Sequence, residues 1–378
     1  MKKFTVLDLF CGCGGMSWGL HKNGFNVVAG IDTWEPALNT FQLNHPEAIA
    51  INANLTELKP GDLLKKIPIL KKTDLDCIIG GPPCQGFSKN VPAAYRFMED
   101  PRNLLFKEYL LFVDWFRPKV VIMENVAEIN NAYNGEVREE IISVLSKMGY
   151  KVAVKVIQTH EYGVPQKRRR CVFFASNTGI DPHFPEKTHG EEERDTFFGE
   201  QKKYVSAWDA ISDLPVLENG EGAESMDYDK TPQNEYQEFM RRDSHILWDH
   251  ATRKLKSLQY QRIKSLKPGQ GIKDLPARIR PLGGYSGAYG RLDFEMVSPT
   301  ITRWVFHPGS GRYSHPREVR TLTMREAARI QSFSDDFRFT GTFTQKAGQI
   351  GNAVPPLLMT VLSERIMECC LGGSLVSR

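Results

Sequence analysis

The sequence predicts an α/β fold, in which a parallel sheet carries helices on both of its faces. Two observations support this prediction. Over residues 4–177, short apolar runs typical of strands alternate with runs that have helical spacing. After about Asn177 the sequence pattern changes, because residues 181–235 are rich in charged residues, Gly and Pro and contain few periodic runs. We therefore expect a sheet-containing region followed by a less regular one.

Each element of the first region can be justified in chain order. Five short apolar runs predict strands, at 4–10, 25–32, 75–81, 118–125 and 170–177. Helical spacing separates several of them, at 15–24, 35–46 and 137–150, with Gly24 ending the first helix and Pro36 near the start of the second. Much later, residues 323–333 resume helical spacing, and Thr323 and Glu326 have the spacing of a capping box.

Composition excludes several classes of protein. The 378 residues suffice for two domains, or for one large domain with an insertion. A hydrophobic content of 41% and a charged content of 25% are typical of a soluble globular protein, and no stretch approaches the roughly 18 apolar residues of a membrane span. Asp8 interrupts the first apolar run, which argues against a signal peptide. Seven cysteines without a regular framework favour a reducing compartment, and we expect a cytoplasmic protein.

Charge is unevenly distributed along the chain. The net charge is +4, but the stretch from Arg241 to Arg291 holds 12 Lys and Arg against 3 Asp and Glu, a net +9 that leaves −5 for the rest. We call this stretch the basic block. It indicates a polyanionic partner, although a solvated surface that happens to be basic explains the charge equally well.

Two features predict a ligand site, because ligands of an open parallel sheet bind beyond the carboxyl ends of its strands. "DLFCGCGGMS", residues 8–17, directly follows the first strand, and its glycines allow the backbone to approach a ligand closely. Asp32 ends the second strand 20 residues after Gly12, where an acid suits the hydroxyls of a ribose, and Trp34 could pack on an adenine. Together they indicate a nucleoside cofactor. The alternative is a glycine turn with a helix-capping Asp.

Two further strand ends carry reactive side chains. In "GGPPCQGFS", residues 80–88, two prolines fix the backbone in front of Cys84, whose thiol is a good nucleophile in a polar loop. Cys77, inside a strand, fits instead the ordinary buried cysteine. Glu124 follows a strongly apolar strand and could serve as a proton donor. A capping or salt-bridged Glu is the alternative at that position.

Three arginines precede the last predicted strand of this region. Strand alternation would turn Arg168 and Arg170 to one side and Arg169 to the other, and arginines that face a site could hold a phosphate or a carbonyl oxygen. A basic surface run is the alternative. We predict no metal site, because Cys11 and Cys13 lie in a tight glycine turn and no second cysteine pair has zinc spacing.

Six stretches occur in a fixed order between Asp8 and Pro356, and together they resemble one family. They are "DLFCGCGG", "GGPPCQGFS", "MENV", "QKRRR", "RTLTMREAARIQSF" and "QIGNAVPP". The combination resembles the DNA (cytosine-5)-methyltransferases, of the bacterial restriction–modification type. The resemblance implies a Rossmann-like methyltransferase sheet, over 1–177 plus 342–378, with an inserted smaller target-recognition domain over 178–341. It also implies S-adenosyl-L-methionine as methyl donor, S-adenosyl-L-homocysteine as product, and no metal.

The resemblance also assigns roles to residues. Cys84 matches the nucleophile that adds to C6 of a cytosine flipped out of double-stranded DNA, and Glu124 matches the acid that contacts N3 and the amino group. Arg168 and Arg170 match arginines that help to hold the base and this acid. The implied cofactor contacts are Phe10, Gly12, Cys13, Gly14, Gly15, Asp32, Thr33, Trp34, Asn54, Leu55, Pro83, Leu105, Asn352 and Ala353. Asn54 and Thr33 depart from the family's common pattern, which has an acid and a larger apolar residue there.

Partners and alternatives follow from the same resemblance. It implies a monomer that works on double-stranded DNA in the bacterial cytoplasm, associated with the nucleoid through its substrate, with a cognate restriction endonuclease as a candidate partner. A tRNA-methylating branch shares the catalytic plan, but its usual "CFT" after the variable region is missing here. A catalytically silent DNA-binding module is a further alternative. A nicotinamide oxidoreductase would need the G-x-G-x-x-G spacing that the glycine turn does not have.

Overall fold

The computed structural model describes residues 3–68, 70, 75–83, 105–196, 199–283 and 286–372, which divide into two compact units. Unit 1 consists of Met1–Gln158, Arg169–Glu186 and Pro356–Arg378, and unit 2 of Thr159–Arg168 and Lys187–Pro355. These boundaries differ from those expected at 177 and 342. Within the described ranges, no helix has the length and apolar character that crossing a membrane requires.

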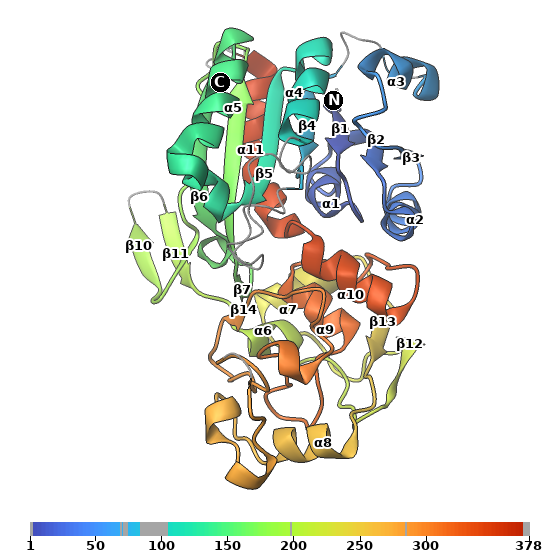
Figure 1. Cartoon of the computed structure of the whole chain (residues 1–378), viewed down its shortest axis with the longest axis vertical. Coiled ribbons are helices and arrows are strands. Elements are labelled where there is room, and N and C mark those ends of the chain that lie inside the picture. The colour runs from blue at the N-terminus through green and yellow to red at the C-terminus, as the bar shows by residue number, and fades with distance from the viewer. Residues whose placement is uncertain are drawn as a thin grey trace. The chain divides into compact units, whose positions relative to one another are not determined.

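Unit 1 is built on a seven-stranded sheet (Figure 1). In sheet order its strands are β3 (Ile49–Asn52), β2 (Asn26–Asp32), β1 (Thr5–Leu9), β4 (Cys77–Gly80), β5 (Val120–Val126), β8 (Arg169–Ser176) and β6 (Lys151–Gln158). The strands from β3 to β5 are parallel, but β8 runs antiparallel to both β5 and β6. The predicted α/β class is confirmed, and the expected parallel pairing holds from β3 to β5 but not at β8. No α-helix separates β6 from β8, and such a return connection gives antiparallel pairing.

Helices cover the sheet of unit 1. They are α1 (Gly15–His21), α2 (Glu35–Asn44), α3 (Pro60–Lys66), α4 (Leu105–Phe116), α5 (Glu136–Lys147) and α11 (Pro356–Leu371). One core joins alternate strand residues, such as Leu7 of β1 and Met123 of β5, to apolar side chains of α3, α4 and α5. Helix α11 packs instead on α1, where a Cβ at Gly19 would lie 2.2 Å from the Pro356 carbonyl oxygen. Only glycine allows this approach.

Unit 2 has short elements. Its helices are α6 (Ala207–Ile211), α7 (Glu235–Arg241), α8 (Ser257–Lys264), α9 (Met324–Ile330) and α10 (Phe343–Asn352). Its strand pairs are β12 (Gly222–Met226) with β13 (Leu247–Ala251) and β7 (Gln166–Lys167) with β14 (Ser298–Pro299), and β11 (Gly199–Lys203) lies between β9 (His189–Gly190) and β10 (Arg194–Thr196). The predicted capping box begins α9, because the Thr323 hydroxyl accepts from the Glu326 N–H and the Glu326 carboxylate accepts from the Thr323 N–H.

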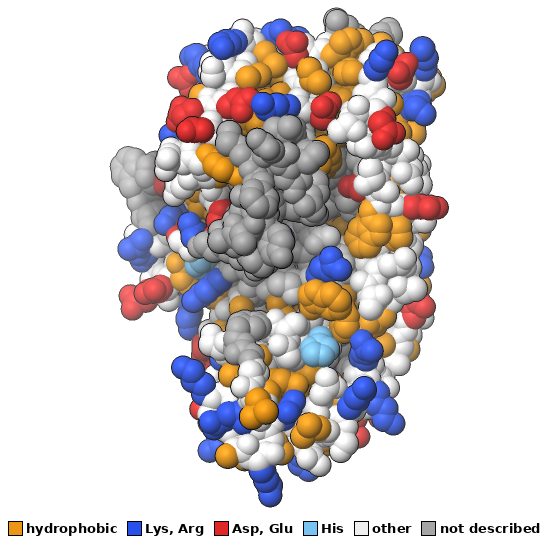
Figure 2. Space-filling view, viewed as in Figure 1, with side chains coloured by type: hydrophobic (Ala, Val, Ile, Leu, Met, Phe, Trp, Pro, Cys, Tyr) orange, Lys and Arg blue, Asp and Glu red, His pale blue; other side chains and the backbone are white. Residues whose placement is uncertain are grey.

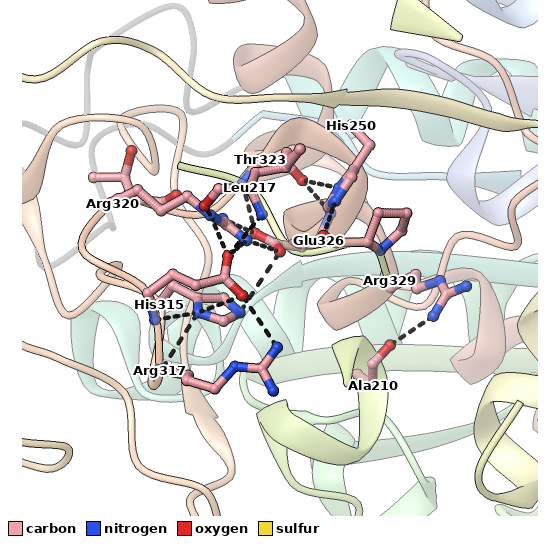
Figure 3. Close-up of polar contacts among 12 residues, drawn as sticks. Ala210, Leu217, His250, His315, Arg317, Arg320, Thr323, Glu326 and Arg329 are labelled. Atoms are coloured by element: carbon pink, nitrogen blue, oxygen red, sulfur yellow. Dashed lines mark hydrogen bonds and ion pairs between the residues drawn. The ribbon is translucent and has the colours of Figure 1, made fainter. Parts of the chain in front are cut away.

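Buried ion pairs around α9 organise unit 2, and Figure 3 shows the one between Arg320 and Glu326. The Arg320 guanidinium donates to both carboxylate oxygens of Glu326, at 2.8 and 2.7 Å. Although burial opposes ionisation, Arg320 holds the pKa of the Glu326 carboxyl well below its usual range. Arg329, fully buried, pairs with Asp335 at 2.9 and 2.6 Å and with Asp213 of the turn after α6. Charges buried this deeply are tolerated only when each has its partner.

Replacing Arg329 by methionine is therefore expected to destabilise unit 2 strongly. The change leaves the carboxylates of Asp213 and Asp335 buried without this cation, and breaking a buried ion pair in this way costs about 3–5 kcal/mol. Urea unfolding followed by fluorescence measures the effect. Arg317→Gln, at a half-exposed arginine, is the control. A shift of the midpoint no larger than that of the control would show that the α9 ion pairs do not stabilise the fold.

Candidate functional site

The turn after β1 has the backbone shape that the glycines predicted. Phe10, Gly12 and Gly14 all have left-handed conformations, with φ of 60°, 53° and 91°. A Cβ at Gly14 would lie 2.9 Å from the ring of Phe41 and 3.2 Å from that of His45, so the turn rests on α2 at that point. At Gly12 an added Cβ would meet no atom of the described residues within 4 Å. The turn is therefore closed against the protein at Gly14 and open at Gly12.

Asp32 is tied to this turn. Its carboxylate accepts the Gly12 N–H at 2.8 Å and the Trp34 N–H at 2.8 Å, one through each oxygen. Burial raises the pKa of the Asp32 carboxyl, which these N–H groups oppose. Asp32 thus supports the backbone of the glycine turn, but it is not the helix-capping Asp of the alternative interpretation, because the N-cap of α2 is Trp34. Each oxygen has a second lone pair, so the carboxylate can still accept hydrogen bonds from the hydroxyl groups of a ligand.

The remaining implied cofactor contacts have different surroundings. Trp34 is half-buried, and Thr33 is exposed beside it. Asn54, after β3, is exposed, and its side chain forms hydrogen bonds within its own turn. It donates to the Glu57 carboxylate and accepts the Thr56 N–H. The others differ in burial and place: Gly15 and Leu105 begin α1 and α4, Leu55 is part of the core, Pro83 is exposed, and Asn352 and Ala353 lie in unit 2.

A carboxylate and a guanidinium meet at the end of β5. Glu124 is 8% exposed, and its Oε1 lies 2.6 Å from Nε of Arg170 at the start of β8. A Cβ at Gly81 would lie 3.1 Å from Oε2 of Glu124. The Asn125 side chain donates to the Pro82 carbonyl oxygen at 3.0 Å. The main chain that leads into Cys84 is therefore held against the Glu124 carboxylate, while Cys84 itself lies outside the described residues.

The glycine turn and this pair lie at the same edge of the sheet. A Cβ at Gly80, the last residue of β4, would lie 2.1 Å from the carbonyl oxygen of Leu9, the last residue of β1. Strand β4 pairs on its other side with β5, which carries Glu124. The adjacent ends of β1, β4 and β5 thus bring together a turn suited to a cofactor, the entry to a cysteine loop and an ion-paired acid.

Arg168 lies elsewhere. Strand β8 begins at Arg169, so the expected alternation does not reach Arg168, which belongs to unit 2. Arg168 is 2% exposed and donates to the carbonyl oxygens of Ile301, Gly351 and Ala353, at 3.3, 3.2 and 3.0 Å. Arg170, not Arg168, contacts the acid. The bonds of Arg168 hold the end of α10, where Asn352 and Ala353 lie.

The hypotheses about a ligand site assigned no role to Asp8, which is a buried acid beneath the glycine turn. It is 1% exposed, accepts the Ser17 hydroxyl at 2.6 Å and has a pKa raised to about 7, chiefly by burial. An Asp inside an otherwise apolar strand is the signal that could have found it. Burial also raises the pKa of the Cys13 thiol to about 12, so this cysteine is no thiolate at neutral pH.

Asp8 makes stability depend on pH. Because the pKa of its carboxyl is about 7 in the folded chain and about 3.9 when unfolded, its stabilising effect is complete below about pH 4 and is lost as the pH rises through 7. The free energy of unfolding of Asp8→Asn, relative to that of wild type, should therefore be about 2 kcal/mol higher at pH 8 than at pH 5. Urea unfolding at both pH values measures this difference, with Asp62→Asn in α3 as control. An equal gain at the two pH values would contradict it.

The basic block divides into structural and exposed cations. Arg241 pairs with Asp213, Arg262 and Arg280 hold the carbonyl oxygens of Ile279 and Leu275, and Arg291 is 7% exposed among carbonyl oxygens. The remaining cations are exposed: Arg242, Arg253, Lys254, Lys256, Lys264, Lys267, Lys273 and Arg278. Within the described residues, no group of three or more His, Cys, Asp or Glu could hold a metal ion.

Comparison with known proteins agrees with this geometry. A family model described as C-5 cytosine-specific DNA methylase matches residues 4–368. The chain is 36% identical to the type II methyltransferase M.DdeI of Desulfomicrobium norvegicum, over 96% of this chain and 88% of that protein. It is 34% identical to the type II methyltransferase M1.HphI of Haemophilus parahaemolyticus, over 96% and 87%.

A solved structure shares the fold. It is that of a DNA modification methyltransferase encoded within a prophage in E. coli, with a TM-score of 0.77 and 23% identity, covering 97% of this chain and 99% of that one. The likeness supports a Rossmann-like methyltransferase fold for the chain.

Proposed function

The chain belongs to the C-5 cytosine-specific DNA methylase family, and from that premise we propose that it methylates a cytosine turned out of double-stranded DNA, through a covalent bond between Cys84 and the base. The observation that carries this proposal is the contact of Glu124 with Arg170, beside the main chain that leads into Cys84. Addition to a cytosine ring requires a nucleophile and an acid that stabilises the charge on the ring.

The proposed reaction assigns one step to each group. The Cys84 thiolate forms a bond to C6, and the electron pair of the C5–C6 double bond becomes available at C5. Glu124, oriented by Arg170, contacts N3 and the amino group and stabilises the charge that addition places on the ring. C5 would then take the methyl group with this electron pair, as the bond between that group and the donor's sulfonium sulfur breaks and leaves its electrons on the sulfur. Loss of the C5 proton to a base and departure of the cysteine sulfur then restore the C5–C6 double bond.

The glycine turn fits the methyl donor implied by the family. Its open side at Gly12, the Asp32 carboxylate below it and the half-buried Trp34 suit a methionine, a ribose and an adenine in that order. When bound, S-adenosyl-L-methionine supplies a methyl group activated by its sulfonium. In this proposal Asp32 orients the ribose, and Phe10, Gly12, Cys13, Gly14 and Gly15 line the methionine part. The resemblance also assigns cofactor contacts to Asn352 and Ala353, and within unit 2 the bonds of Arg168 to Gly351 and Ala353 hold this stretch of chain.

DNA binding is assigned to the exposed cations of the basic block. Target atoms of a stacked base are inaccessible, so the cytosine must be extruded at a cost of a few kcal/mol, and phosphate contacts hold the distorted duplex. Replacing Lys264, Lys267 and Lys273 by glutamine should weaken binding and flatten its dependence on salt. Unchanged affinity and salt dependence would remove the basic block from the proposal.

We propose a biological role in restriction and modification. Two relatives that the chain matches over most of their length are named type II methyltransferases. The chain would then act as a monomer on the nucleoid of a bacterium, in the cytoplasm, and protect a short DNA sequence from a cognate endonuclease. Which sequence it protects depends on loops of unit 2 that read base edges.

The first experiment is methyl transfer from labelled S-adenosyl-L-methionine to plasmid DNA and, separately, to tRNA, followed by bisulfite sequencing of the labelled product. Label in DNA at one short recurring sequence is the expected result and gives the target at the same time. Label in tRNA alone would move the chain to the tRNA-methylating branch. Cofactor binding without any label would leave a catalytically silent DNA-binding module.

A further inference from the structure

A tight loop of unit 2 holds a tryptophan in solvent. We call Thr302–Ser310 the Trp304 loop. The Val305 N–H donates to the Thr302 carbonyl oxygen at 3.1 Å, and the His307 N–H and the Ser310 hydroxyl donate to the Trp304 carbonyl oxygen at 2.9 and 2.6 Å. Val305 is fully buried and Phe306 is 4% exposed, whereas Trp304 is 50% exposed. The loop is thus anchored by its neighbours and presents the indole outward.

Two arginines stand over the aromatic rings of this loop. The Arg303 guanidinium carbon lies 5.2 Å from the centroid of the Trp304 ring, and that of Arg253 lies 5.4 Å from the centroid of Phe306. Both arginines are exposed, and neither forms an ion pair with any described carboxylate. Residues 299–311 contain no Asp or Glu. The loop therefore presents an aromatic face edged by positive charge that no described acid neutralises.

The loop is also fixed in place. A Cβ at Gly351 would lie 2.3 Å from the Arg303 nitrogen and 2.4 Å from the Thr302 carbonyl carbon, so the end of α10 packs directly on the first residues of the loop. The Tyr313 hydroxyl donates to the Thr300 carbonyl oxygen at 3.0 Å, just before the loop. A contact made by Trp304 would not have to order a flexible segment first, which favours binding.

Charge selects the kind of partner. A single exposed apolar residue needs no explanation, but an indole held rigidly beside two unneutralised arginines is more specific. Over the elements of unit 2, the charged side chains that Figure 2 shows are mostly Lys and Arg. The backbone of duplex DNA offers phosphates, which suit guanidinium groups, beside deoxyriboses, whose apolar faces suit an indole.

We propose that the Trp304 loop, which has Arg253 of the basic block beside it, is a further contact for the DNA backbone, in which Arg303 binds a phosphate and Trp304 packs on the adjoining deoxyribose. The inference rests on the proposed function, since it takes double-stranded DNA as the partner. Contacts of this kind position the duplex and carry no base information. The loop therefore contributes affinity for DNA of any sequence.

Equilibrium binding of the full chain to a labelled duplex, as a function of salt, tests the proposal. Arg303→Gln should lower the slope of log Kd against log salt concentration by about one, the change expected when one phosphate contact is lost. Trp304→Ala should weaken binding about fivefold on target and non-target duplexes alike and leave the slope unchanged, and Trp304→Phe should recover part of the loss. Lys66→Gln and Leu111→Ala, at exposed positions of α3 and α4, are the matched controls.

The outcomes separate the loop from the enzyme. Wild-type chain that methylates DNA, with loop variants that bind duplex as the controls do, would overturn the loop proposal and leave the proposed function standing. Loss on the target duplex alone would also overturn it, because it would make Trp304 a reader of sequence. A rise in the Kd for S-adenosyl-L-methionine without a change in DNA binding would do the same, by assigning the loop to the cofactor. Wild-type chain that neither binds nor methylates DNA would instead remove the proposed function.

Discussion

Cys84→Ser should reduce methyl transfer by at least about a thousandfold while leaving DNA affinity within about twofold of wild type. Serine keeps the shape of the side chain, but its hydroxyl is far less acidic than a thiol and a much weaker nucleophile at neutral pH. Addition to C6 should therefore stop, and C5 should not become reactive enough to take the methyl group. Label transfer to target DNA measures the first quantity, and equilibrium binding to the same duplex the second.

Cys77→Ser provides the matched control for this change. Cys77 is fully buried in β4, and burial raises the pKa of its thiol well above the usual value. It therefore has no catalytic assignment, and its variant should lose activity only as far as it loses folded protein. Full activity in Cys84→Ser would exclude the covalent mechanism. Loss of DNA binding together with activity would show that Cys84 acts by shaping the protein.

The sequence predicted the parts of the site that depend on local backbone chemistry. Glycines that need left-handed conformations, at Gly12 and Gly14, and an acid at the end of the next strand were enough to predict the shape of the turn and the carboxylate beside it. Glu124 was predicted for a similar reason, since it follows a long apolar strand. In each case the informative residues lie within a few positions of a strand end, where parallel topology brings them to one edge.

Features that depend on distant residues could not be predicted in this way. Arg168 and Arg170 are two positions apart and were assigned one role, but only Arg170 lies in β8, and the partners of Arg168 are 133 to 185 residues away. Nothing in the sequence indicated that the side chain of Leu55, an implied cofactor contact, packs in the core of unit 1. Arg329 pairs with Asp213 across 116 residues, which no periodicity reveals. Strand β6 was missed although Val152, Val154 and Val156 alternate regularly.

The second large effect concerns the contact of Glu124 with Arg170. Glu124→Gln should lower the rate of methyl transfer by about a hundredfold to ten-thousandfold, because an amide can neither donate the proton nor carry the charge of the carboxyl group. Arg170→Met removes the guanidinium that lies 2.6 Å from Glu124 Oε1 and should cost about tenfold to a hundredfold through misplacement of the acid. Single-turnover label transfer with saturating cofactor measures both.

Combining the two changes tests whether the pair acts as a unit. If Arg170 works by orienting Glu124, then Arg170→Met has nothing left to disturb once the acid is gone, and the double variant should be no slower than Glu124→Gln alone. Arg169→Gln, at the exposed neighbour, is the matched control and should leave the rate unchanged. Losses that multiply would instead mean that Arg170 acts on the reaction independently of Glu124 and not by orienting this acid.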